Sequence, residues 1–118
     1  MKKILIVDDE PNIVMTLEYT FKKSNYEVFI ARDGQEALDI LKTNFPDVII
    51  LDIMMPMVDG FATLEQIRKD ANLQHTKVMF LSAKNKESDI EKGLALGADA
   101  YMTKPFSIKK VVEKVEEL

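Results

Sequence analysis

Residues 4–12 read ILIVDDEPN, an apolar run that ends in three consecutive acids and a proline. Four apolar residues in a row predict a strand that is buried on both faces. Carboxylates crowded at the end of such a strand repel one another, and burial penalises each charge further. Asp8, Asp9 and Glu10 therefore need a compensating positive group. Pro11 favours a helix that starts directly after the acids, because proline suits the first helical turn.

Apolar runs recur along the chain, and segments of helical periodicity separate them. The predicted strands are residues 4–7, 26–31, 47–51, 77–82 and 100–103. Between them and after the last, apolar residues recur three or four positions apart, as on one face of a helix. This alternation predicts a single α/β domain with a parallel sheet and helices on both faces. The expected N-caps of three helices are Asp33, Asp59 and Ser107.

The composition limits the classes of protein to which the chain can belong. The chain has 118 residues, no cysteine, one histidine and a formal net charge of -4. These values indicate one globular domain without disulfides or structural zinc. No run of Lys or Arg forms a basic patch, so we expect no direct binding of nucleic acid. We also expect a cytoplasmic protein, because no apolar segment is long enough for a membrane span or a secretion signal.

The carboxyl ends of the predicted strands carry charged and polar side chains. In an open parallel sheet, ligands bind outside these ends, where the strand order reverses. In chain order, the charged and polar residues at these ends are Asp8, Asp9, Glu10, Asp52, Ser82 and Lys104. We therefore expect carboxylates, a hydroxyl and an ammonium to meet at one edge of the sheet.

A group of carboxylates with only oxygen ligands favours a hard cation. Mg²⁺ binds through one or two carboxylates, keeps several waters and accepts phosphate oxygens in its other positions. Such an ion beside a lysine and a hydroxyl is an arrangement that binds a phosphoryl group. With no Cys or His nearby, a carboxylate is the candidate nucleophile, forming an aspartyl-phosphate. Asp52 is the best candidate, because it stands alone, whereas Asp8 and Asp9 form a pair.

Four motifs together resemble the receiver domain of two-component response regulators. They are ILIVDDEPN, PDVIILDIMMPMVDGFATLEQIR, VMFLSA and GADAYMTKPF, and the resemblance covers essentially all of residues 1–118. Each motif alone is weakly specific, but the set in this order and spacing is highly specific. The resemblance implies a flavodoxin-like (βα)5 domain with strand order 2-1-3-4-5. It also implies phosphotransfer from the phosphohistidine of a sensor histidine kinase.

The resemblance assigns metal-binding roles to individual residues. Asp52 is the expected phosphoacceptor. Asp9, Asp52 and the backbone carbonyl of Met54 are the expected ligands of Mg²⁺, and Asp8 is expected to help directly or through a water.

The resemblance also implies a switch. Ser82 and Lys104 are expected to contact the phosphoryl group, and the bond between Lys104 and Pro105 is expected to be cis. Phosphorylation adds about -1.5 to -2 charge, which would draw the Ser82 hydroxyl toward the new acceptor. Tyr101 would then turn into the vacated space. The surface that changes would comprise the fourth helix, fifth strand and fifth helix, about residues 87–115, and would bind an output domain or a partner protein.

Other functions remain compatible with these residues. The acids could serve only as favourable charge at a helix N-terminus. A Mg²⁺-dependent phosphatase could use Asp52 as its nucleophile, but it would need a second acid at the position of Met54. A binding module with a vestigial site is a third alternative.

We expect a signalling switch, not a turnover enzyme, with self-catalysed phosphoryl transfer. The resemblance further implies that the positions of Met54 and Lys84 tune reactivity, and neither residue is an acid or amide that positions water well, so autodephosphorylation should be slow.

Two positions bear on the oligomeric state. The chain resembles receivers of winged-helix DNA-binding regulators that dimerise through the fourth helix, fifth strand and fifth helix, and these typically carry an acid and an arginine where Ala100 and Lys114 stand here. We therefore expect a monomer or a weak, phosphorylation-dependent dimer. The sequence does not decide between a single-domain regulator, which we slightly prefer, and the receiver of a longer protein.

Overall fold

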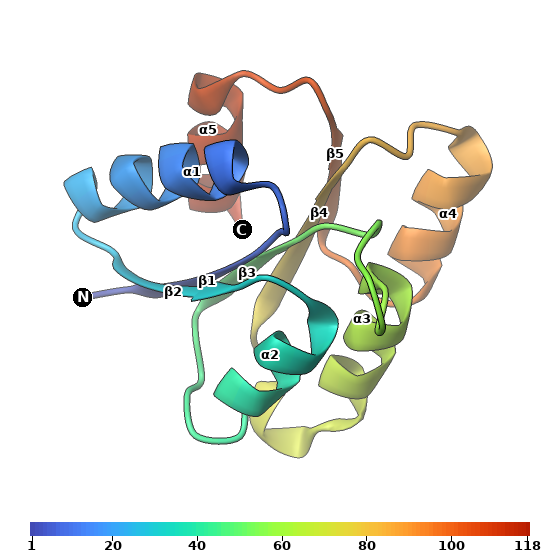
Figure 1. Cartoon of the computed structure of the whole chain (residues 1–118). Coiled ribbons are helices and arrows are strands. Elements are labelled where there is room, and N and C mark those ends of the chain that lie inside the picture. Colours follow the sequence, from blue (N-terminus) through green and yellow to red (C-terminus); the bar gives the residue numbers. More distant parts are fainter.

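Strands and helices alternate along the chain, as the sequence pattern predicts. The computed structural model describes residues 1–118 (Figure 1). Its elements are β1 (Lys3–Val7), α1 (Pro11–Lys23), β2 (Glu27–Ala31), α2 (Gly34–Ile40), β3 (Val48–Leu51), α3 (Gly60–Lys69), the 3-10 turn η1 (Ala71–Leu73), β4 (Lys77–Ser82), α4 (Glu87–Ala95), β5 (Ala100–Thr103) and α5 (Ile108–Glu117). All strand pairs are parallel, and the order β2-β1-β3-β4-β5 confirms the predicted topology. None of the helices has the length and apolar character needed to cross a membrane.

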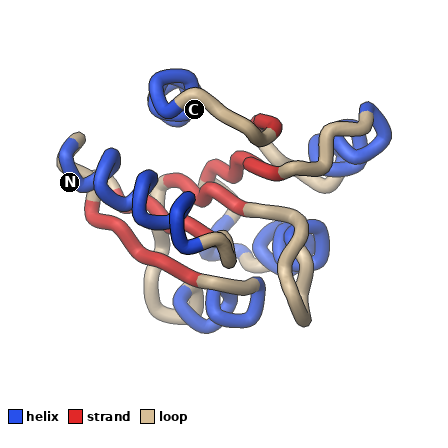
Figure 2. Tube along the Cα trace, turned by 45° about the horizontal axis from the view of Figure 1, so that its top comes forward, coloured by secondary structure: helices blue, strands red, loops and turns tan.

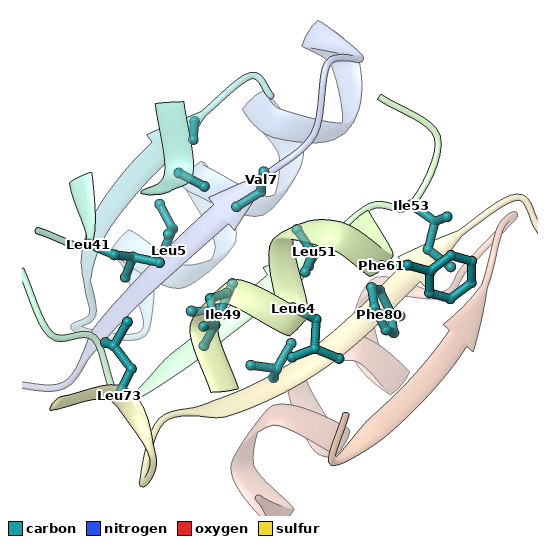
Figure 3. Packing of buried hydrophobic residues seen from close by; sticks show 14 residues of the cluster. Leu5, Val7, Leu41, Ile49, Leu51, Ile53, Phe61, Leu64, Leu73 and Phe80 are labelled. Atoms are coloured by element: carbon teal, nitrogen blue, oxygen red, sulfur yellow. The ribbon is translucent and has the colours of Figure 1, made fainter. Parts of the chain in front are cut away.

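The sheet separates two hydrophobic cores, because successive side chains of a strand point to opposite faces. Figure 2 shows helices on both sides of the strands. On one side, Ile4 and Ile6 of β1 pack with residues of α1 and α5. On the other, Leu5 and Val7 belong to a cluster that includes residues of α2 and α3 (Figure 3). Burial on both faces explains why the first strand is uniformly apolar and not alternating.

The local signals for helix starts are confirmed. The side chains of Asp33, Asp59 and Ser107 each accept a hydrogen bond from a backbone N–H in the first turn of α2, α3 and α5. These bonds satisfy donors that the helix itself leaves without partners. Pro11 is the first residue of α1, as predicted.

Arg68 ties three segments together at the end of the sheet where the strands begin. From α3, its guanidinium donates to the backbone carbonyls of Gly97, at 2.9 and 3.0 Å, and Thr76, at 2.9 Å. It also forms a 3.0 Å ion pair with Asp99, whose carboxylate accepts the N–H of Val78. The side chain is 21% exposed, so these bonds are partly shielded from water. The C-terminal end of α4 is thereby fixed to α3.

The loop between β3 and α3 contains one unfavourable backbone conformation. Met57 has φ 67°, and its side chain is an exposed apolar group at 85% relative accessibility. The left-handed region costs a residue with a Cβ about 1–2 kcal/mol, and glycine avoids this cost. Glycine is also more flexible in the unfolded chain, which offsets part of the gain. We therefore expect Met57→Gly to raise the free energy of unfolding by about 0.5–1 kcal/mol, measured by urea denaturation.

The control for this substitution is Asn25→Gly, at a position with φ 68°. Asparagine adopts the left-handed region more readily than methionine, so this second change should give a smaller gain. A larger gain at Asn25 than at Met57 would contradict the explanation by backbone strain.

Candidate functional site

The register of the sheet brings the predicted site residues together. Val7 pairs with Leu51, and the N–H of Asp52 donates to the carbonyl of Val7 at 2.9 Å, so Asp8 and Asp52 leave adjacent strands side by side. Likewise, the N–H of Lys104 donates to the carbonyl of Ser82 at 2.8 Å. The acids, the hydroxyl and the lysine therefore meet at the carboxyl edge of the sheet, as predicted.

Lys104 lies among three carboxylates. Its Nζ is 2.9 Å from Oδ2 of Asp8, 3.0 Å from Oε1 of Glu10 and 3.6 Å from Oδ2 of Asp52. The bond between Lys104 and Pro105 is cis, which confirms the prediction. Burial would lower the pKa of Lys104, but the hydrogen bonds to Asp8 and Glu10 and the negative charges of Asp52 and Asp8 together outweigh it and hold that pKa above its ordinary value. The ammonium therefore stays charged and supplies part of the compensation that the acids need.

Asp52 is a buried carboxyl group whose ionisation is disfavoured. Burial raises the pKa of Asp52, and the neighbouring charge of Asp8 raises it further. The Lys104 ammonium, a hydrogen bond with the Ser82 hydroxyl and the backbone N–H of Ile53 act in the opposite direction without cancelling the increase. This carboxylate would gain stability from any further positive charge placed beside it.

The raised pKa of Asp52 predicts how the free energy of unfolding depends on pH. Between the ordinary carboxyl pKa of about 4 and the raised value, the folded state binds more protons than the unfolded state. The free energy of unfolding therefore falls as the pH rises through this window. Asp52→Asn removes the titration, so we expect a higher midpoint of thermal unfolding at pH 7 in a buffer without divalent cations. The difference should shrink as the pH approaches about 4.

Asp47→Asn is the matched control for this measurement, because Asp47 directly precedes β3 whereas Asp52 directly follows it. Asp47 is exposed, and its carboxylate accepts a hydrogen bond from the N–H of Lys3. The control should not raise the midpoint at pH 7. A midpoint for Asp52→Asn at or below the wild-type value would contradict the expected effect.

Three carboxylates lie close enough to hold one metal ion. Oxygens of Asp8, Glu10 and Asp52 are all within 4.8 Å of one another, and oxygen is the ligand type that Mg²⁺ prefers. The donor set therefore fits this ion. Asp9 is not in the group; its side chain is exposed and lines a neighbouring hollow. The roles of Asp9 and the Met54 carbonyl as ligands stay predictions.

Ser82 and Tyr101 lie on the β4 side of the site. The Ser82 hydroxyl is fully buried and accepts the N–H of Lys84 at 3.3 Å. The Tyr101 hydroxyl donates to the carbonyl of Lys84 at 2.6 Å, and its ring lies 5.7 Å from that of Phe80. The loop after β4 thus connects the two side chains, but their role as a switch stays a prediction.

Glu10 was not among the site residues predicted from the sequence. The sequence placed Glu10 with Asp8 and Asp9 at the end of the first strand but assigned a role at the site only to that pair. The structure instead places Asp8 and Glu10 against Lys104. The available signal was the spacing, because alternate residues of an extended chain point to the same side.

The comparisons with known proteins agree with this geometry. The model of the response regulator receiver domain family matches residues 4–116. The alkaline phosphatase synthesis transcriptional regulatory protein PhoP of Bacillus subtilis (strain 168) is 45% identical over 117 residues. The match includes 99% of this chain but only 48% of PhoP, so this chain spans about half the length of that relative.

Solved structures show the same fold. The Francisella response regulator 1452 receiver domain has a TM-score of 0.91 and 37% identity, with 99% of this chain and 95% of that chain covered. The Vibrio cholerae chemotaxis protein CheY4 has a TM-score of 0.93 and 31% identity, with 99% and 98% covered. One conclusion follows from the topology, from the edge at which the charged residues meet and from these matches. This chain belongs to the response regulator receiver domain family of two-component systems.

Proposed function

We propose that Asp52 accepts a phosphoryl group from the phosphohistidine of a sensor histidine kinase, and that the aspartyl-phosphate switches the protein between two signalling states. The observation that carries the proposal is the position of Asp52. It is a buried carboxylate at the carboxyl end of β3, with Lys104 at 3.6 Å and the Ser82 hydroxyl beside it. Lys104 and Ser82 can donate hydrogen bonds to a phosphoryl group, so the Asp52 carboxylate is the group that acts as the nucleophile.

The transfer exchanges one bond to phosphorus for another. A carboxylate oxygen of Asp52 attacks the phosphorus, the new O–P bond forms and the P–N bond to the imidazole breaks, with its electron pair left on the nitrogen. The Lys104 ammonium and the Ser82 hydroxyl donate to phosphoryl oxygens, on which negative charge is spread. A bound Mg²⁺ would supply further positive charge to these oxygens. Asp8, Asp9, Asp52 and the backbone carbonyl of Met54 are the residues that we propose to hold it.

The proposal is tested by the intact mass of the protein after incubation with acetyl phosphate and MgCl₂. Wild type should gain one phosphoryl group per chain, and Asp52→Asn should gain none. The control Asp47→Asn keeps the site and should label like wild type. Absence of labelling in the wild type would favour a binding module with a vestigial site. Sustained release of phosphate well beyond one equivalent would favour the phosphatase instead.

The aspartyl-phosphate should be long-lived. The residue two positions after Asp52 is Met54, which is 57% exposed and has no side-chain group that orients a water for attack. Lys84, two positions after Ser82, is not a good water-positioning group either. We expect a lifetime of minutes or longer in Mg²⁺ buffer. It is measured as the rate at which the phosphoryl mass is lost after acetyl phosphate is removed. Met54→Glu should shorten it, and sub-minute decay of the wild type would contradict the prediction.

The output surface in this proposal comprises α4, β5 and α5. A groove of about 610 Å³ lies there, lined in part by Ile90, Tyr101, Phe106 and Lys110. Tyr101 thus connects the loop after β4 with the proposed partner surface. By similarity to PhoP, whose name describes a transcriptional regulatory protein, we propose that this surface acts on an output domain or a downstream protein. We also propose a cytoplasmic location, which is the one expected from the sequence.

A further inference from the structure

Glu10 occupies the N-cap position of α1 without capping the helix. Its side chain accepts no hydrogen bond from the first turn, although N-cap acids commonly do so. The backbone N–H of Glu10 donates to Oδ1 of Asp8 at 2.9 Å, and its carboxylate accepts from the Lys104 ammonium at 3.0 Å. The side chain is therefore directed toward the site and not toward its own helix.

The position of the Lys104 ammonium depends on partners of unequal burial. The side chains of Lys104, Asp8 and Asp52 are 9%, 4% and 4% exposed, whereas that of Glu10 is 57% exposed. The ammonium lies closer to Asp8 and Glu10, at 2.9 and 3.0 Å, than to Asp52, at 3.6 Å. Glu10 is thus the one exposed partner of the ammonium, and it lies closer to the ammonium than Asp52 does.

We propose that Glu10 is a positioning residue that holds the Lys104 ammonium at the rim of the site and so keeps Asp52 available to a divalent cation. Without Glu10, the remaining partners of the ammonium are Asp8 and Asp52. The ammonium would then lie closer to both carboxylates than it does in the wild type, and a cation that binds them would have to displace it. The inference rests on the proposed function, because it gives these carboxylates to the metal and Asp52 to the phosphoryl group.

Two other roles for Glu10 lead to different results. Its charge could attract cations at a distance, independently of its contact with Lys104. Its oxygen could also bind the ion directly, since it lies within 4.8 Å of oxygens of Asp8 and Asp52. The three roles are separated by the length of the side chain and by the presence of the lysine.

The first experiment measures Mg²⁺ affinity by calorimetric titration of the wild type, Glu10→Gln and Glu10→Asp. Positioning requires both charge and reach, so both variants should bind Mg²⁺ about threefold to fivefold more weakly, at the upper end of the range for an exposed ion pair. Attraction by charge alone predicts wild-type affinity for Glu10→Asp, which would overturn the inference. Glu18→Gln is the matched control, because it removes the same charge from α1, where Glu18 pairs with Lys22, and it should bind Mg²⁺ like wild type.

The second experiment repeats Glu10→Gln in a Lys104→Met background. If Glu10 acts through the ammonium, its substitution should change the Mg²⁺ affinity of this background less than twofold, about the error of such additivity tests. A direct ligand would lose the same factor in both backgrounds, and that result would overturn the inference. Thermal unfolding shows whether each variant is folded, and Lys104→Gln replaces Lys104→Met as the background if the first double variant does not fold.

Labelling by acetyl phosphate separates this inference from the proposed function. If wild type does not label at Asp52, the proposed function fails, whatever the titrations show. If wild type labels but Glu10→Gln and Glu10→Asp bind Mg²⁺ as wild type does, only the role of Glu10 fails. Agreement of both experiments with expectation supports the two together.

Discussion

Gly60→Ala is expected to lower the free energy of unfolding by about 3 kcal/mol, at the upper end of the range for overpacking. A Cβ at this position would overlap the backbone carbonyl oxygen of Asp52 and lie 2.7 Å from Cα of Ile53. The N–H of Gly60 also donates to the carbonyl of Ile53 at 2.9 Å, which fixes the start of α3 against the end of β3. Because backbone and not a flexible side chain opposes the methyl group, the strand end that carries Asp52 must move.

Urea denaturation measures this effect, and Gly93→Ala is its control. The added Cβ at Gly93, inside α4, would meet ring atoms of Phe80 at 3.0 Å and Tyr101 at 3.2 Å. These rings can shift slightly, and alanine favours the helix by up to about 1 kcal/mol, so the control should be much less destabilising. Equal losses in the two variants would contradict the argument from backbone contact.

Lys104→Met is expected to lower the free energy of unfolding by about 2–3 kcal/mol at pH 7 without divalent cations. Removal of one partner from a buried ion pair typically costs about 3–5 kcal/mol, and we expect less here because water reaches Glu10. The substitution leaves Asp8 and Asp52 buried without their cation and removes the influence that lowers the pKa of Asp52. Mg²⁺ should restore much of the loss, since a ligand at 100 times its Kd stabilises by about 2.7 kcal/mol.

The pH dependence of this effect follows from the same groups. Lys104 has a raised pKa in the folded state, so its contribution is fully present below the ordinary lysine pKa of about 10.4. The penalty for the unpaired Asp52 carboxylate develops as the pH rises above about 4 and should shrink below it, because Asp52 is then protonated. Urea denaturation at pH 4 and pH 7, with and without Mg²⁺, measures both effects. Lys109→Met, an exposed lysine of α5, should show neither.

The positions of Asp52, Ser82 and Lys104 were predictable from the sequence because they depend on topology alone. Each residue directly follows or ends an apolar run, and parallel strands bring their carboxyl ends to one edge. The sheet order and the bounds of the runs therefore determine these positions to within a residue. The same reasoning predicted the helix starts at Asp33 and Asp59, where a short polar side chain precedes the first turn.

The contacts of Glu10 and Arg68 were not predictable in the same way. Alternation along an extended chain indicates that Asp8 and Glu10 point to one side, but it does not show that this side faces Lys104, because side-chain direction in the turn after β1 depends on local dihedral angles. The partners of Arg68 are mostly backbone carbonyls, which every residue carries and which leave no signal in the sequence. Such contacts become visible only when the packing of distant segments is known.

The bonds of Arg68 make the two ends of α4 unequal. Beyond the C-terminal end, the carbonyl of Gly97 is held by two guanidinium nitrogens. The N-terminal end follows Lys86, which provides no side-chain cap, and adjoins the loop that contacts Ser82 and Tyr101. We therefore expect that a displacement starting in this loop would tilt the helix about a pivot near Gly97 and would not slide it along the sheet. The residues farthest from that pivot, at the first turn of α4, then travel the greatest distance.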